Sequence, residues 1–191
     1  MKSCKTSVFL ATLLAPAVAS ADIGDEIHKY GMGVSVGGGA VALVSTDVEF
    51  TELLGVGWEA RVAFGTKTRL HVEAAYIGSF YGLGQSDEWD RDVLGTGVEG
   101  NFRVNLFRGN IQPYFLGGVG WTRFTVVKAG LGGPQMGPYN VAMLPMGLGL
   151  GFRLGNATLD LRAVYRKTAF GGMGYGDLSS LGVGLRAGFE Y

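Results

Sequence analysis

Eight segments of the sequence alternate apolar residues with small or charged residues, and clusters of Gly, Asn and Asp separate the segments. A period of two is typical of half-buried β-strands, because successive side chains point to opposite faces. The pattern therefore predicts an all-β chain. The predicted strands cover residues 30–44, 53–64, 68–82, 91–107, 111–127, 140–154, 157–169 and 179–191.

The connections between these strands alternate strictly between short and long. Membrane barrels of bacteria sort their connections in this way, with brief periplasmic turns at one end and longer external loops at the other. We therefore predict an eight-stranded antiparallel up-and-down transmembrane β-barrel. The short turns are 65–67, 108–110 and 155–156, and the long connections are 45–52, 83–90, 128–139 and 170–178.

The two faces of each strand favour a membrane barrel over a soluble one. In segment 179–191, Leu181, Val183 and Leu185 share one face, while Arg186 and Glu190 share the other with several glycines. In a soluble barrel, this pattern would either bury many charges in the core or expose many Leu and Val side chains to water, and both are energetically costly. Lipid outside and a polar lumen inside remove that conflict.

Two predicted strands fit this pattern less well. Segment 111–127 has apolar residues on both faces. In segment 30–44, the run Gly37–Gly39 interrupts the alternation, and a β-bulge there would exchange the two faces. Aromatic residues near the strand ends fit interfacial girdles. They are Phe64, Phe107, Phe152 and Phe189 at one end, and Phe80, Tyr81 and Phe170 at the other.

Residues 1–21 form a leader with a basic start, an apolar run and the small residues Ala19, Ser20 and Ala21. This is the pattern of a secretory signal peptide, and we expect cleavage after Ala21. Residues 22–191 then form one barrel domain with 14 basic and 16 acidic residues and a formal charge of −2. This near balance provides no basic patch for nucleic acid.

The chain resembles the small outer-membrane β-barrel proteins, a family that includes the OmpA transmembrane domain, OmpX and OmpW. The resemblance covers residues 25–191 and is carried by the leader, the eight strands, the phrase NIQPYFLGGVGW and the ending GVGLRAGFEY. It implies insertion in the outer membrane and contact with outer-membrane lipid and lipopolysaccharide. It also implies that the assembly machinery recognises Phe189 and the final aromatic residue, Tyr191.

Charged residues of both signs fall on the predicted inner face, so we expect a salt-bridged network in the lumen. Glycines concentrate toward the external half, which predicts an outward-opening cup, unless they only permit strong strand coiling. The predicted network consists of Glu59, Arg61, Arg69, His71, Glu73, Glu99, Arg103, Asp160, Arg162, Arg166, Arg186 and Glu190.

The sequence is compatible with three functions. They are a structural or surface-interaction role with a charge-plugged lumen, a narrow pore or small-molecule conduit, and a lipid-modifying enzyme. His71 faces the lumen near Glu73 and lacks the closely spaced Ser of lipid A deacylases, so we expect no catalysis, cofactor or metal. One external loop offers acidic residues around an aromatic for an unknown surface ligand. These candidates are Asp87, Glu88, Trp89 and Asp90.

Overall fold

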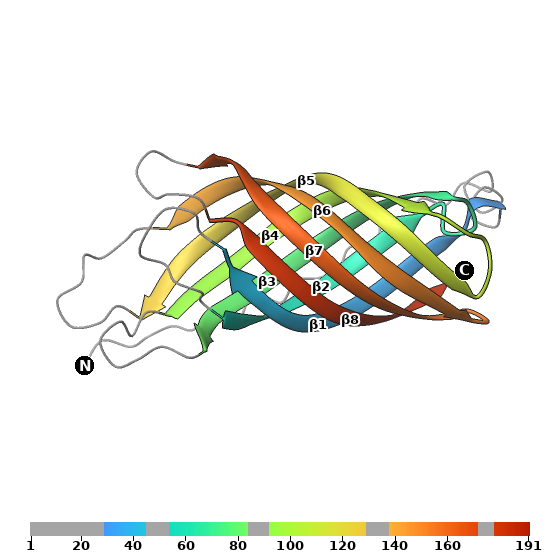
Figure 1. Ribbon diagram of the computed structural model, residues 1–191, viewed down its shortest axis with the longest axis horizontal. Helices are drawn as coiled ribbons and strands as arrows, with labels where there is room; N and C mark the ends of the chain where they lie inside the picture. Colours follow the sequence, from blue (N-terminus) through green and yellow to red (C-terminus); the bar gives the residue numbers. More distant parts are fainter. Residues whose placement is uncertain (1–28, 45–53, 84–91, 129–137, 172–177) are drawn as a thin grey trace, which may run out of the picture.

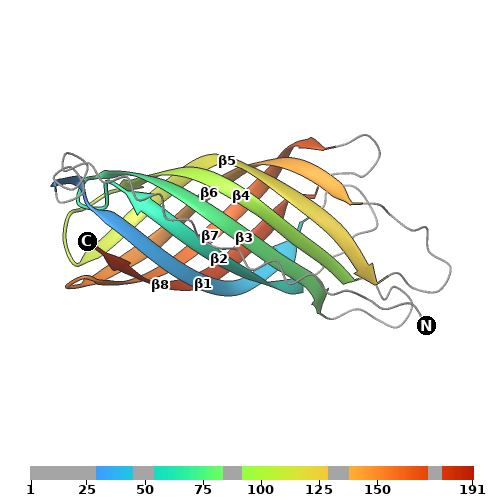
Figure 2. The same cartoon turned by 180° about the vertical axis from the view of Figure 1, so that it is seen from behind.

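The computed structural model describes residues 29–44, 54–83, 92–128, 138–171 and 178–191, which form a closed eight-stranded barrel (Figures 1 and 2). The predicted fold class is confirmed, and each strand end lies within two residues of its predicted position. The strands are β1 (Met32–Leu43), β2 (Leu54–Phe64), β3 (Leu70–Leu83), β4 (Asp92–Asn105), β5 (Ile111–Lys128), β6 (Tyr139–Leu154), β7 (Ala157–Gly171) and β8 (Ser180–Glu190).

Every strand pairs antiparallel with its sequence neighbours, and β8 closes the barrel by pairing with β1 from Gly33 opposite Glu190 to Leu43 opposite Ser180. Closure leaves no unpaired sheet edge. The short connections and the C-terminus lie at one end of the barrel, here called the turn end. The long connections join the strands at the opposite end, the loop end.

Glycine permits the tight turns at the turn end. Gly155 has a φ of 65° and, with Asn156, joins β6 to β7. Gly65 has a φ of 79° and donates its N–H to the Gly31 carbonyl at 2.9 Å, which ties the β2–β3 turn to the start of β1. Left-handed φ values of this kind cost glycine little and other residues more.

The outer wall is apolar, because alternate positions of the strands carry exposed aliphatic and aromatic side chains. Val36, Val98 and Val119 are 65%, 58% and 65% exposed although each lies within a strand. The opposite positions carry buried polar residues, including Arg61, Glu73 and Arg162. Within the described ranges, no helix combines the length and apolar character that a membrane crossing requires.

The suggested β-bulge at Gly37–Gly39 is wrong. Pairing runs without a shift through these glycines on both sides of β1, and the register shifts lie near the loop end of β2, β4 and β6. Leu43 therefore stays on the inner face. It belongs to a buried group that we call the apolar cap, which also includes Phe124 of β5. The members of the apolar cap are Leu43, Tyr81, Phe124, Val141 and Met143.

The aromatic residues only partly follow the predicted girdles. Phe64, Phe107 and Phe189 are exposed at the turn end, and Phe170 is 80% exposed near the loop end. Tyr81 is a correction, since it is 2% exposed and packs within 6.4 Å of the Phe124 ring, measured between centroids. Tyr81 continues the inward positions of β3, which include Glu73 and Ile77, and the register shift follows it.

An arginine at the middle of the outer wall should destabilise the barrel strongly if lipid covers that wall. Val98 is opposite Tyr76 on one neighbouring strand and Trp121 on the other. In phospholipid vesicles, Val98→Arg should lower the free energy of unfolding by about 2–4 kcal/mol. Phe107→Arg, at the turn end, should cost about 0–1 kcal/mol. Equal, small losses in a denaturant titration would contradict a lipid-facing wall.

Candidate functional site

Seven charged side chains from five strands meet in the middle of the lumen and form ion pairs with one another. We call this group the central cluster. It contains four arginines and three carboxylates, and the alternation of β2, β3, β4, β7 and β8 directs all of them inward. Its members are Glu59, Arg61, Glu73, Arg103, Asp160, Arg162 and Arg186.

Glu73 is one centre of the cluster. Arg61 donates from Nη1 to Glu73 Oε2, while Arg162 Nη2 lies 3.4 Å from the same oxygen and Arg103 Nη1 lies 3.7 Å from Oε1. The Glu73 side chain is 2% exposed. A buried carboxylate is tolerated only when its charge is compensated, and three guanidinium groups supply that compensation here.

Asp160 is the second centre. Arg103 Nη1 lies 3.0 Å from its Oδ2, and Arg186 Nη2 lies 2.7 Å from its Oδ1. The Tyr114 hydroxyl donates to the same Oδ1 at 2.7 Å, and the Arg103 guanidinium carbon stands 3.7 Å from the centroid of the Tyr114 ring. Charge-assisted bonds and a cation–π contact therefore hold Asp160 and Arg103 together.

Two further ion pairs lie outside the central cluster. Arg166 Nε is 2.5 Å from Glu99 Oε1 on the loop-end side, and Arg153 Nη2 is 2.6 Å from Glu190 Oε2 at the turn end. Arg166, Glu99 and Glu190 were predicted in one network with the others. The structure instead divides the luminal charges into three groups along the barrel.

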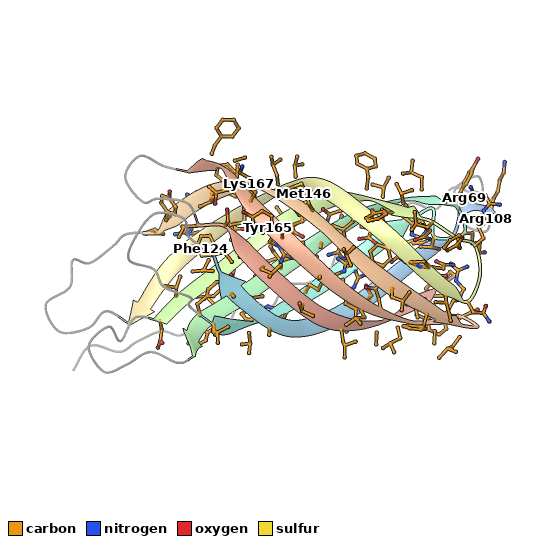
Figure 3. All side chains as sticks on the ribbon, in the orientation of Figure 1. Arg69, Arg108, Phe124, Met146, Tyr165 and Lys167 are labelled. Carbon is orange, nitrogen blue, oxygen red and sulfur yellow. The ribbon has the colours of Figure 1, made fainter. Side chains whose placement is uncertain are left out.

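Arg69 is a correction to the predicted network. It precedes the first residue of β3, is exposed, and lies with Arg108 at the turn end (Figure 3). The alternation of faces applies only inside the sheet, so it could not place this residue. His71, by contrast, is buried in the lumen, where its Nε2 atom lies 2.9 Å from the Thr68 carbonyl oxygen and 3.0 Å from Asn105 Nδ2.

Tyr114 and Gln112 also belong to the luminal polar network, although the sequence pattern did not place them there. Gln112 accepts a hydrogen bond from Asn105 Nδ2 at 2.9 Å, and Tyr114 bonds Asp160. The usable signal was the parity of β5, because Gln112 and Tyr114 are two residues apart and so share one face. The apolar residues on both faces of this strand concealed it.

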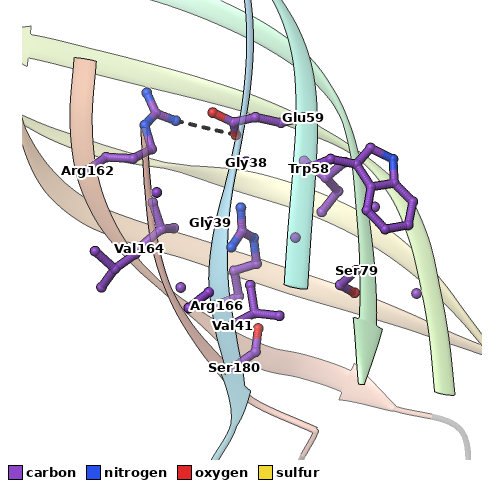
Figure 4. A pocket seen from close by; sticks show the side chains of 18 of the residues that line it. Gly38, Gly39, Val41, Trp58, Glu59, Ser79, Arg162, Val164, Arg166 and Ser180 are labelled. Carbon is purple, nitrogen blue, oxygen red and sulfur yellow. Dashed lines mark ion pairs between the residues drawn. The ribbon is translucent and has the colours of Figure 1, made fainter. Parts of the chain in front are cut away.

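A cavity lies on each side of the central cluster. The loop-end cavity has a volume of about 70 Å³ and is lined by Glu59, Arg162, Arg166, several wall glycines and members of the apolar cap (Figure 4). The turn-end cavity has a volume of about 50 Å³ and a more polar lining that includes Arg61, His71 and Glu190. Both cavities have room for water, since one molecule needs roughly 10–15 Å³ of such volume.

The predicted outward-opening cup is wrong in its upper part. Its floor is the central cluster, and glycines do line its wall, including Gly39, Gly57 and Gly182. Met143, however, is 2% exposed and packs with the other members of the apolar cap over the loop-end side of this space. The cup is therefore capped by side chains of the strands themselves.

The luminal groups provide little for catalysis. Among the residues that the structure describes, no group of three or more His, Cys, Asp and Glu could hold a metal ion. The carboxylates of the central cluster are engaged by arginines, and His71 is held by backbone and amide groups. Residues 1–21 and the acidic stretch from Asp87 to Asp90 lie outside the described residues.

Solved structures with a similar fold include several small barrels of the outer membrane. Neisserial surface protein A has a TM-score of 0.61 at 14% identity, covering 84% of this chain and 97% of that one. Ail of Yersinia pestis has a TM-score of 0.53 at 17% identity, covering 84% and 98%. The chain has the fold of the small eight-stranded outer-membrane barrels.

The outer-membrane enzyme PagL is also similar, with a TM-score of 0.50 at 15% identity over 82% of this chain and 98% of that one. The same fold therefore occurs with and without catalysis, and it does not by itself exclude an enzyme. No protein-family model matches the sequence, and no curated protein matches it.

Removing one carboxylate from the centre of the cluster should cost far more stability than removing one from its edge. Glu73→Gln leaves three buried arginines short of a partner, so we expect a loss of about 3–5 kcal/mol in the free energy of unfolding. Glu190→Gln breaks one partly exposed pair and should cost at most about 1 kcal/mol. Denaturant titration of both refolded variants measures the difference, and similar losses would contradict the division between cluster and outlying pair.

Proposed function

We propose that this chain is an integral outer-membrane protein with a structural or surface-interaction role, whose lumen is closed by the central cluster. Residues 1–21 serve as a cleaved signal peptide, and residues 22–191 form the membrane domain. The loop end faces the outside of the cell and the turn end faces the periplasm. The apolar outer wall, the leader and the fold support this assignment.

The main support for a closed lumen is that the ion pairs of the central cluster extend across it. Its ion pairs link β2 to β3, β3 to β4 and β7, β4 to β7, and β8 to β2 and β7, so they cross the interior from several directions. An eight-stranded barrel is just wide enough for its own side chains. Charged groups that pair across so narrow a lumen leave no continuous path for ions.

The second candidate, a narrow pore or small-molecule conduit, rests on the two cavities. They extend from the central cluster toward opposite ends. Among the described residues, the central cluster lies between them, and the apolar cap lies over the loop-end cavity. A lipid-modifying enzyme is the least supported of the three functions, because His71 lacks a neighbouring nucleophile among its hydrogen-bond partners.

Ion conductance across planar bilayers tests the closed lumen. The refolded chain of residues 22–191 should show no unitary steps, because the central cluster closes the lumen. Truncating Arg103 and Arg162 together to Ala removes two of its four arginines and should produce steps. The matched control truncates Glu99 and Arg166, a pair outside the cluster, and should stay silent. Unitary steps in the native chain would favour the conduit instead.

The outer wall also points to contact with lipopolysaccharide. Among strand residues whose side chains are described, Arg123 and Lys167 are the charged residues that are exposed. Arg123 is opposite Asn140 and Lys167 is opposite Leu144, so the two cations flank β6 toward the loop end. Lys167 is labelled in Figure 3. Cations are tolerated near a membrane interface, where they pair with lipid phosphates. Ail, a barrel of the same fold, has been crystallised with the heparin analogue sucrose octasulfate, which is also a polyanionic sugar.

Replacing both wall cations should weaken the binding of lipopolysaccharide to the refolded protein. Each cation near a membrane surface contributes about 1 kcal/mol, so Arg123→Gln with Lys167→Gln should lower the affinity about 30-fold. The matched control removes the same charge at the turn end through Arg69→Gln with Arg108→Gln, and its affinity should not change. Equal losses in a binding titration of the two variants would mean that net charge, and not this site, attracts the lipid.

The other proposed contacts lie at the ends of the chain and in the loops. Phe189 and Tyr191 present exposed rings 5.4 Å apart between centroids, and they are proposed to carry the signal for the outer-membrane assembly machinery. The Tyr191 N–H donates to the Met32 carbonyl, which holds the last residue against β1. Asp87, Glu88, Trp89 and Asp90 remain candidates for contact with an unknown surface ligand.

A further inference from the structure

The turn-end cavity has more positive than negative charge in its lining. Four arginines and three carboxylates line it: Arg61, Arg103, Arg153 and Arg186 against Glu73, Asp160 and Glu190. Arg162 and Glu59, the two members of the central cluster that do not line this cavity, add one charge of each sign. Over the cavity lining and the central cluster together, arginines therefore outnumber carboxylates by one.

Each carboxylate around the cavity is already occupied by arginines. Glu73 contacts Arg61, Arg103 and Arg162, Asp160 contacts Arg103, Arg162 and Arg186, and Glu190 contacts Arg153. The excess charge therefore cannot be neutralised by regrouping these pairs. An uncompensated ion in a buried site costs several kcal/mol, unless a counterion accompanies it.

Three buried polar atoms of residues that line the same cavity have no hydrogen-bond partner among the described residues. They are Nε of Arg61, Nε of Arg153 and Oγ1 of Thr66. The two Nε atoms can only donate a hydrogen bond, and the threonine hydroxyl can donate one. The Arg61 side chain is 1% exposed, so bulk water does not satisfy its Nε–H. This set of donors matches an acceptor that brings negative charge.

We propose that the turn-end cavity binds a small monovalent inorganic anion, such as chloride, beside Arg61, Arg153 and Thr66. The volume of about 50 Å³ accommodates an ion of this size, which is only slightly larger than a water molecule. Water alone would satisfy the donors but would leave the charge uncompensated. The anion meets both needs, because it accepts hydrogen bonds from the donors and neutralises the excess positive charge beside the central cluster.

The loop-end cavity provides a contrast within the same lumen. Two buried atoms without a hydrogen-bond partner come from residues that line it: Arg162 Nη1, which is a donor, and Glu59 Oε1, which is an acceptor. The Arg162 and Glu59 side chains stand next to each other, 3.9 Å apart at their closest charged atoms (Figure 4). Such a mixed pair suits water and does not select an anion. Arg166 and Arg186 also line the loop-end cavity, but they pair with Glu99, Glu59 and Asp160. The choice of the turn end therefore rests on its set of unpaired donors.

Thermal unfolding of the refolded barrel in chloride and in gluconate, at equal ionic strength, tests the proposal. Gluconate is too large for the cavity, so the unfolding midpoint should rise with chloride concentration and stay constant in gluconate. Arg153→Gln removes the excess charge at a partly exposed position and should abolish the chloride response. Glu190→Gln raises the excess to two charges and should enlarge that response. Arg166→Gln, which removes a luminal arginine outside the cavity, should keep it.

Two results would overturn the proposal. One is an equal response to chloride and gluconate. The other is a loss of the chloride response in Arg166→Gln as well as in Arg153→Gln, since that would indicate general screening of the lumen. If Arg153→Gln does not fold, crystals of the native protein grown in bromide decide the question. An anomalous peak beside Arg61 and Arg153 supports the site, and a cavity without one contradicts it.

Discussion

Backbone N–H and C=O groups at membrane depth have no water to bond with, and each unsatisfied group costs several kcal/mol. The pairing of β8 with β1 meets this requirement for the whole chain, because it converts a sheet with two edges into a barrel with none. In a closed barrel within a membrane, alternate side chains must point either to the lipid or to the lumen. Apolar residues face lipid, and whatever remains must fill a lumen of eight strands.

That lumen sets the second constraint. The interior of an eight-stranded barrel is just wide enough for its own side chains, so its polar residues have to satisfy one another. The central cluster does this by sharing partners: Glu73 contacts three arginines, and Asp160 contacts three arginines and Tyr114. Sharing lets four arginines and three carboxylates remain buried, and the same crowding produces the excess positive charge beside the turn-end cavity.

The sequence was sufficient for the strands, their order and most of their faces, because closure makes the period-two pattern unusually regular. It was insufficient where the sheet ends. Arg69 is outside the luminal network because it precedes β3. Tyr81 was expected in an interfacial girdle from its place near a strand end, but it lies on the inward-facing positions of β3. The sequence also could not predict which luminal side chains pair with one another. Arg103 meets Asp160 across 57 positions of the sequence, and such a contact depends on strand tilt and stagger, which alternation does not encode.

Shared partners also bear on whether the central cluster acts as a plug or as a gate. A gate needs two arrangements of similar free energy, in which a charged side chain exchanges one partner for another. Moving Arg103 would break its contacts with Glu73, Asp160 and Asn105 and remove it from the ring of Tyr114. Moving Arg162 would release Glu73 and Asp160 at once. Because each displacement breaks several buried interactions and the narrow lumen offers few replacements, the arrangement of charges favours a plug that holds the barrel closed.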